Sequence, residues 1–81
     1  MIQLTYSRSA VKVINGMDRA TKQRIKAAIE KIPAGDIKPL KGSSGSYRLR
    51  VGGWRILFSY PGDGIILIEK VGPRGDVYKG V

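Results

Sequence analysis

Three arginines lie close together in the sequence, and their spacing favours the binding of phosphate groups. Arg48 and Arg50 precede a Gly-Gly pair, and Arg55 follows it. Guanidinium groups stay charged at every relevant pH and bind phosphate oxygens in forked pairs. Several of them on one surface would therefore form a site for a phosphodiester backbone.

A β-hairpin is the element that would bring these arginines together. Gly52 and Gly53 can supply the two positive-φ positions of a two-residue turn. Because side chains alternate along a strand, this register sets Arg50 directly opposite Arg55 on one face. Like charges so placed destabilise a sheet by roughly a few tenths of a kcal/mol, which indicates a binding role rather than a folding role. The other face carries apolar pairs: Val51 with Trp54, Leu49 with Ile56, and Tyr47 with Phe58.

Carboxylates are the alternative partners for these arginines. The acids after residue 36 are Asp63, Glu69 and Asp76. They are too few for the neighbouring cations, and we expect only Glu69 to lie close. We therefore favour phosphate binding over ion pairing.

The composition narrows the chemistry further. The chain has 81 residues, no cysteine and no histidine, and fifteen basic against six acidic residues give a net charge of +9. The commonest metal ligands and the commonest general base near neutral pH are therefore missing, so we expect no metal and no cofactor. The excess of positive charge indicates a polyanionic partner, which could be nucleic acid, a membrane surface or an acidic protein.

The length and the N-terminal pattern predict a single domain over residues 1–81. Residues 1–14 mix polar and apolar positions, so we expect neither a signal peptide nor a membrane span. The absence of cysteine fits a reducing cytoplasm.

Hydrophobic periodicity predicts an α+β fold: an N-terminal strand, two helices, and then an antiparallel meander of three to four strands. Ser7 and Asp18 are the expected helix N-caps, and Pro33 ends the second helix. The remaining segments, in chain order, are a strand at 2–6, a loop at 34–46, the hairpin, an apolar strand at 65–68, a loop at 72–75 and a short strand at 76–79.

Residues after the hairpin could add groups to the arginine face. The register of the strand that begins at Ile65 is open: one slip places Lys70 opposite Arg55, and the other places Glu69 there. Arg74 lies in the following Gly-Pro loop, and Tyr78 comes four residues later. Each is an ordinary surface residue alone but completes a pattern with the arginines.

That pattern resembles the RelE/ParE toxin superfamily of toxin–antitoxin modules, particularly its RelE-like messenger-RNA endonucleases. The resemblance covers nearly the whole chain and is most specific over residues 47–55 and 71–78, with 39–42 as a supporting motif. It implies a RelE-like fold and metal-independent cleavage of messenger RNA in the ribosomal A site, which inhibits translation. It also implies control by a cognate antitoxin, a small and acidic protein.

The resemblance assigns roles position by position. Arg48 and Arg50 match basic residues of the active face that are often lysines, and Arg55 matches an arginine that holds the scissile phosphate. Arg74 matches an arginine near the leaving oxygen, and Tyr78 matches a tyrosine that helps to activate the 2′-hydroxyl. Arginine cannot act as a general base. The 2′-hydroxyl must therefore be activated by Tyr78, or by the positioning of the substrate alone. Lys41 and Lys79 complete the predicted RNA-binding residues, together with Arg48, Arg50 and Arg55.

Two other functions stay open at the level of sequence. One is a ParE-like inhibitor of DNA gyrase without nuclease activity. The other is an RNA-binding domain without catalysis. The dense arginine face, with Arg74 and Tyr78, favours the endonuclease.

Overall fold

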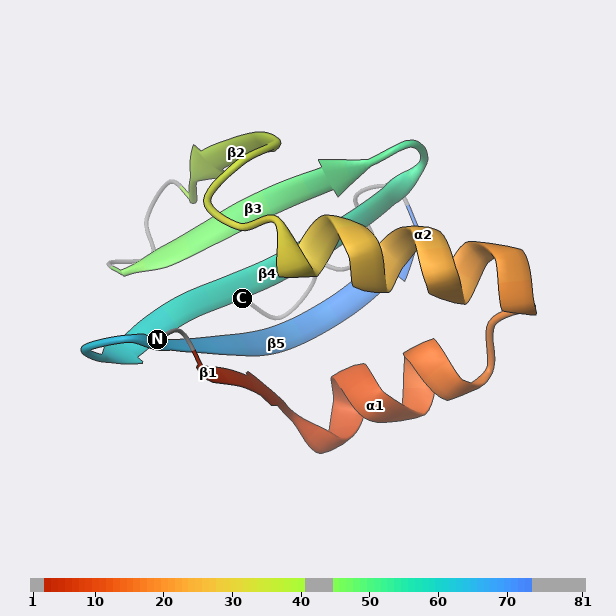
Figure 1. Cartoon of the computed structure of the whole chain (residues 1–81), viewed down its shortest axis with the longest axis horizontal. Helices are drawn as coiled ribbons and strands as arrows, with labels where there is room; N and C mark the ends of the chain where they lie inside the picture. The colour runs from red at the N-terminus through yellow and green to blue at the C-terminus, as the bar shows by residue number, and fades with distance from the viewer. Residues whose placement is uncertain (1–2, 41–44, 74–81) are drawn as a thin grey trace.

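Two helices cover one face of a five-stranded sheet in the computed structural model, which describes residues 3–40 and 45–73 (Figure 1). Neither described helix is both long and apolar enough to cross a membrane. The elements, in chain order, are β1 (Gln3–Tyr6), α1 (Arg8–Asn15), α2 (Arg19–Glu30), β2 (Asp36–Pro39), β3 (Ser46–Val51), β4 (Trp54–Gly62) and β5 (Ile65–Pro73).

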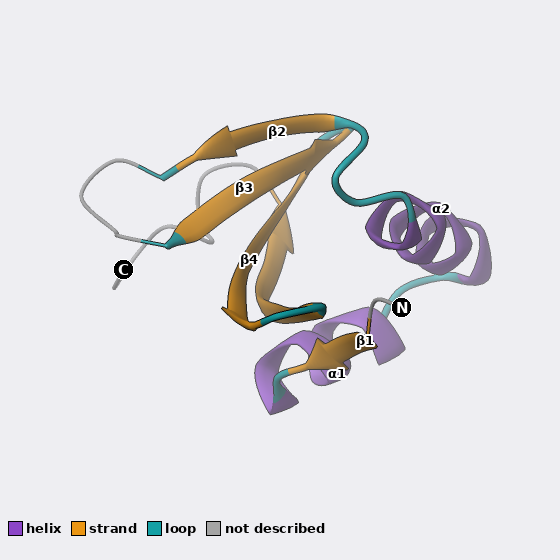
Figure 2. Ribbon diagram, turned by 60° about the vertical axis from the view of Figure 1, so that its left-hand side comes forward, coloured by secondary structure: helices purple, strands orange, loops and turns teal. Residues whose placement is uncertain are grey.

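The strand order in the sheet is β1-β5-β4-β3-β2. Strands β2 to β5 form a four-stranded antiparallel meander, and β1 joins its far edge parallel to β5, with Leu4 opposite Ile66. Both helices lie on the same side of this sheet (Figure 2). The predicted fold class, a strand, two helices and an antiparallel meander, is confirmed.

The two helices begin at the predicted caps. The Ser7 hydroxyl accepts a hydrogen bond from the Ala10 amide at 3.1 Å and donates one to the Glu69 carbonyl at 2.7 Å. The Asp18 carboxylate accepts from the Thr21 amide at 3.0 Å. Each cap satisfies an amide that the first helical turn leaves unpaired. Ser7 also fixes the start of α1 against β5.

The hydrophobic core lies between the helices and the sheet. Aliphatic residues from α1 and α2 meet the apolar face of the hairpin and of β5, as the periodicity predicted. Its fully buried large side chains are Ile25, Ile29, Leu49, Ile56, Phe58, Ile66 and Ile68. Because the helices cover this face of the sheet, the charged side chains of the strands that could bind a ligand lie on the opposite face.

Four predictions need correction. The apolar strand expected at 65–68 continues as β5 to Pro73, so the first two residues of the expected loop at 72–75 belong to a strand. The expected loop at 34–46 contains β2, whose Ile37 pairs with Leu49 of β3. The register of β5 matches neither predicted slip, because bulges shift the β4–β5 pairing and Arg55 stands opposite Gly72. In the hairpin turn only Gly52 has a positive φ, of 59°, whereas Gly53 lies outside the left-handed region. The predicted strand at 76–79 lies outside the described residues.

Candidate functional site

The outer face of the sheet, defined as the face opposite the helices, carries two cross-strand rows in which three of the four residues are charged. The first row runs across four strands as Asp36, Arg50, Arg55 and Gly72. The second runs beside it as Lys38, Arg48, Leu57 and Lys70. Five cations of the described residues therefore share one face, which forms a surface suited to a polyanion.

Arg50 and Arg55 are directly opposite each other, as predicted from the hairpin register. Arg50 is exposed and Arg55 is half-buried. The Arg55 guanidinium donates from Nη1 to the carbonyls of Gly52 and Trp54, at 3.4 and 3.3 Å. Neither arginine forms a salt bridge within residues 3–40 and 45–73. No carboxylate of the described residues therefore pairs with either charge.

Arg48 differs from the other two arginines because it is ion-paired. Its Nη2 lies 3.4 Å from Oδ1 of Asp36, and its side chain is 13% exposed. Asp36 lies on β2, diagonally across from Arg48, which is close enough for long side chains to meet. The prediction that these arginines lack carboxylate partners is therefore wrong for Arg48, because its partner Asp36 precedes the acids at 63, 69 and 76.

Asp36 and Lys38 of the outer face are not among the predicted site residues, and Lys70 stands opposite Leu57 rather than opposite Arg55, where one predicted slip places it. Lys38 belongs to β2, within the predicted loop at 34–46, although Asp36-Ile37-Lys38 alternates as a short strand does. Lys70 faces outward because Glu69 is the extra residue of a bulge, a shift that the spacing of Ile68 and Val71 could have revealed. The Glu69 carboxylate accepts a hydrogen bond from the Ser46 hydroxyl at 3.4 Å.

Four predicted site residues lie outside the described residues: Lys41, Arg74, Tyr78 and Lys79. The structure therefore brings together Arg48, Arg50 and Arg55 of the predicted set. Among the described residues, no three histidine, cysteine, aspartate or glutamate side chains are grouped to hold a metal ion. The described part of the outer face can bind and polarise phosphate groups, since its cations are fixed on paired strands.

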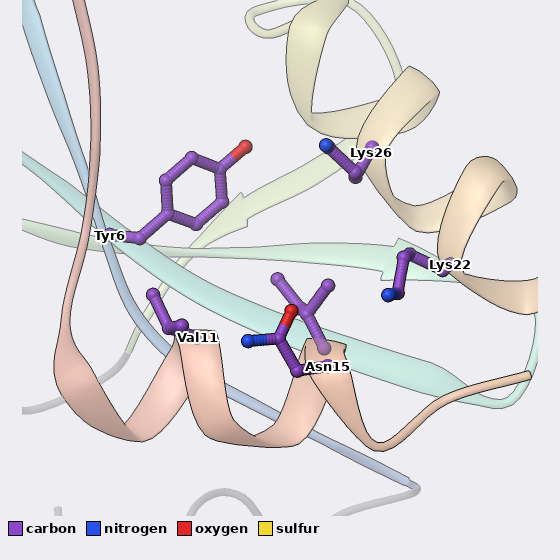
Figure 3. A pocket seen from close by; sticks show the side chains of 6 residues that line it. Tyr6, Val11, Asn15, Lys22 and Lys26 are labelled. Atoms are coloured by element: carbon purple, nitrogen blue, oxygen red, sulfur yellow. The ribbon is translucent and has the colours of Figure 1, made fainter. Parts of the chain in front are cut away.

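A separate cavity lies in the helical layer. A cavity of about 190 Å³ opens between α1 and α2, and Tyr6, Asn15, Lys22 and Lys26 surround its apolar floor (Figure 3). Burial raises the pKa of the Tyr6 hydroxyl, and the Glu30 carboxylate adds to this effect. This cavity shares no residue with the outer face, so it is not part of the arginine site.

One family of known proteins matches the sequence. The family described as "ParE toxin of type II toxin-antitoxin system, parDE" matches residues 4–78, nearly the whole chain. No curated protein matches the sequence closely enough to add to this finding.

Solved structures match the fold. The RelB–RelE antitoxin–toxin complex from Methanococcus jannaschii gives a TM-score of 0.74 at 27% identity, covering 91% of this chain and 94% of that one. The archaeal RelE–RelB complex from Pyrococcus horikoshii OT3 gives 0.72 at 26% identity, covering 93% and 97%. The isolated RelE toxin of E. coli gives 0.72 at 19% identity, covering 96% and 92%, and supports the fold alone.

Proposed function

The chain belongs to the ParE toxin family of type II toxin–antitoxin systems, and from this premise we propose that it is a ribosome-dependent endoribonuclease that cleaves messenger RNA without a metal ion. The observation that carries the proposal is the pair formed by Arg50 and Arg55 on the outer face, where no described carboxylate neutralises either charge. The likeness to two archaeal RelE toxins, at 27% and 26% identity, supports the same assignment.

The proposed reaction is an in-line attack of a ribose 2′-oxygen on the adjacent phosphorus. The new 2′-oxygen–phosphorus bond forms as the bond to the 5′-oxygen breaks, and the product ends in a 2′,3′-cyclic phosphate. Negative charge grows on the phosphoryl oxygens during this step. Arg55, supported by Arg50, would stabilise that charge, since fixed donors are most effective where charge develops.

The proton steps fall to other residues. We assign removal of the 2′-hydroxyl proton to Tyr78 and electrostatic stabilisation of the leaving 5′-oxygen to Arg74, since the family resemblance places these residues at those two oxygens. The leaving 5′-oxygen then takes its proton from water. Lys41 and Lys79 would bind the flanking phosphates. Arg48 is held by Asp36, so we assign it mainly to binding and to the shape of the face.

Mapping message ends in a translation extract tests the proposal. The wild-type chain should produce new 5′ ends within translated messages, and Arg55→Ala should abolish them because it removes the main charge at the scissile phosphate. Lys26→Ala is the matched control, because this exposed cation lies in the helical layer and should leave cleavage unchanged. Normal cleavage by a folded Arg55→Ala protein would refute the site assignment.

The family match to ParE toxins favours a second candidate, inhibition of DNA gyrase without nuclease activity. Induction in cells separates the two functions. Gyrase inhibition would produce DNA breaks while messages stay intact, whereas the endonuclease would cut messages and leave DNA whole. A domain that binds RNA without catalysis would give neither result.

We also propose a cognate antitoxin as the partner. The net charge of +9 suits a small acidic protein. A short acidic protein encoded by a neighbouring gene should restore growth when it is co-expressed with the toxin. Failure of every neighbouring product to do so would contradict this partner.

A further inference from the structure

Arginines from two different elements meet at the β3–β4 turn. A Cβ atom placed on Gly52 would lie 3.0 Å from Nη2 of Arg24, so the guanidinium of this α2 residue rests against the turn. On the same residue, the Gly52 carbonyl accepts from Nη1 of Arg55 at 3.4 Å. Arg24 therefore reaches the edge of the outer face, although its helix covers the other side of the sheet.

A groove continues from this turn along the helix. It lies between α2 and β3, has a volume of about 350 Å³, and is lined by Arg24, Lys31 and Arg50 over Leu49 and Val51. Arg50 thus borders both the groove and the outer face. The two cationic surfaces are continuous through this one residue.

The described part of the chain places one carboxylate beside these arginines, that of Asp36, which lies opposite Arg50 but pairs with Arg48. Within residues 3–40 and 45–73 the salt bridge is that of Arg48 with Asp36, which leaves Arg24, Arg50 and Arg55 without an acidic partner. Like charges held this close repel one another, and a bound anion relieves that repulsion. Phosphate fits well because guanidinium groups can each offer it two donors.

We propose that Arg24 is a further RNA-binding residue, which holds a phosphate at the β3–β4 turn with Arg50 and leads the strand into the groove between α2 and β3. The inference rests on the proposed function and extends its RNA-binding surface around the edge of the sheet. An acidic peptide is the other polyanion that suits these cations. RNA is favoured because an RNA chain bound along the outer face would meet positive charge continuously from there to the β3–β4 turn.

The test measures the affinity of the intact chain for a 2′-O-methyl oligouridylate, which lacks the attacking hydroxyl, over a series of salt concentrations. Arg24→Gln should weaken binding about tenfold at low salt. It should also reduce the slope of log affinity against log salt by about 0.7, the value for one phosphate contact on a single strand. Arg24→Lys keeps the positive charge but loses the paired donors of the guanidinium group, so it should retain most of the salt slope.

Lys26→Gln is the matched control, since it removes one charge from the same helix on the side that faces the α1–α2 cavity. Its slope should equal that of the wild type. Equal slopes for Arg24→Gln and the wild type would overturn the inference while leaving the proposed function standing. No salt-dependent binding by the wild type would overturn both. Loss of oligoglutamate binding with an unchanged RNA slope would assign Arg24 to a protein partner and refute the RNA assignment.

Discussion

Removing the opposed charges of Arg50 and Arg55 should stabilise the fold. Cross-strand neighbours hold their Cβ atoms about 5 Å apart, and we take the two flexible guanidinium groups to be about 7 Å apart. Two like charges at that distance repel by about 0.6 kcal/mol in water. Half-burial of Arg55 lowers the effective dielectric constant, and a value near 40 would double the repulsion to about 1.2 kcal/mol.

A double-mutant cycle isolates this term. The free energy of unfolding in urea is measured for the wild type, Arg50→Gln, Arg55→Gln and the double variant. At low ionic strength these four values should give a repulsive coupling energy of about 0.5–1 kcal/mol between the two arginines. Arg50→Gln alone should raise the melting temperature by roughly 2 °C, because the lost attraction to Asp36, directly opposite on β2, offsets part of the gain. Because the Debye length falls to about 3 Å at 1 M salt, the coupling should nearly vanish there.

The same variants link stability to function. Arg50→Gln should melt higher than the wild type yet cleave messages less, because the charge that strains the sheet is the charge that binds phosphate. A coupling of zero or an attractive coupling at low salt would refute the reasoning. It would show that the two arginines are already compensated within the folded chain.

Three further results are expected. Asp36→Asn should strengthen oligouridylate binding and steepen its salt dependence, because it frees Arg48 from its ion pair; weaker binding would contradict this. Ser7→Ala should lower the free energy of unfolding in urea by about 1–2 kcal/mol, since the hydroxyl caps α1 and also bonds to the Glu69 carbonyl. Because the pKa of Tyr6 is raised in the folded state, its contribution to stability is complete below pH 10.0, the ordinary tyrosine pKa, and is lost as the pH rises through the pKa of the folded state. Tyr6→Phe should remove this alkaline loss in melts between pH 9 and 11. An unchanged loss would exclude Tyr6 as its cause.

The hairpin was predictable because its signals are local. Two adjacent glycines and the alternation of Leu49, Val51, Trp54 and Ile56 are enough to set the turn and the register. The opposition of the two arginines followed from that register alone. The helix caps were equally local, since each needs only a side chain and an amide three residues away.

The missed features depend on contacts between distant segments. Strand β2 has four residues, of which only Ile37 is half-buried, so its pattern is too short to show without β3 beside it. The bulge at Glu69 reverses the alternation of β5 and turns Lys70 outward. The approach of Arg24 to Gly52 is set by how α2 packs on the sheet. Hydrophobic periodicity within one segment gives only a short signal for β2 and for the bulge, and none for the approach of Arg24 to Gly52.

The parallel pairing of β1 with β5 has a consequence for the order of folding. Strand β1 finds its sheet neighbour more than sixty residues later, at Ile65–Ile68, and the Ser7 amide bonds to the Ile68 carbonyl at 2.9 Å. Strand β5 also supplies Ile66, Ile68 and Val71 to the core. A nascent chain that stops before Ile65 therefore lacks the strand that joins β1 to β4 and lacks part of the core. A partly synthesised chain should therefore remain unfolded, and the arginine face forms only when synthesis of this domain is nearly finished.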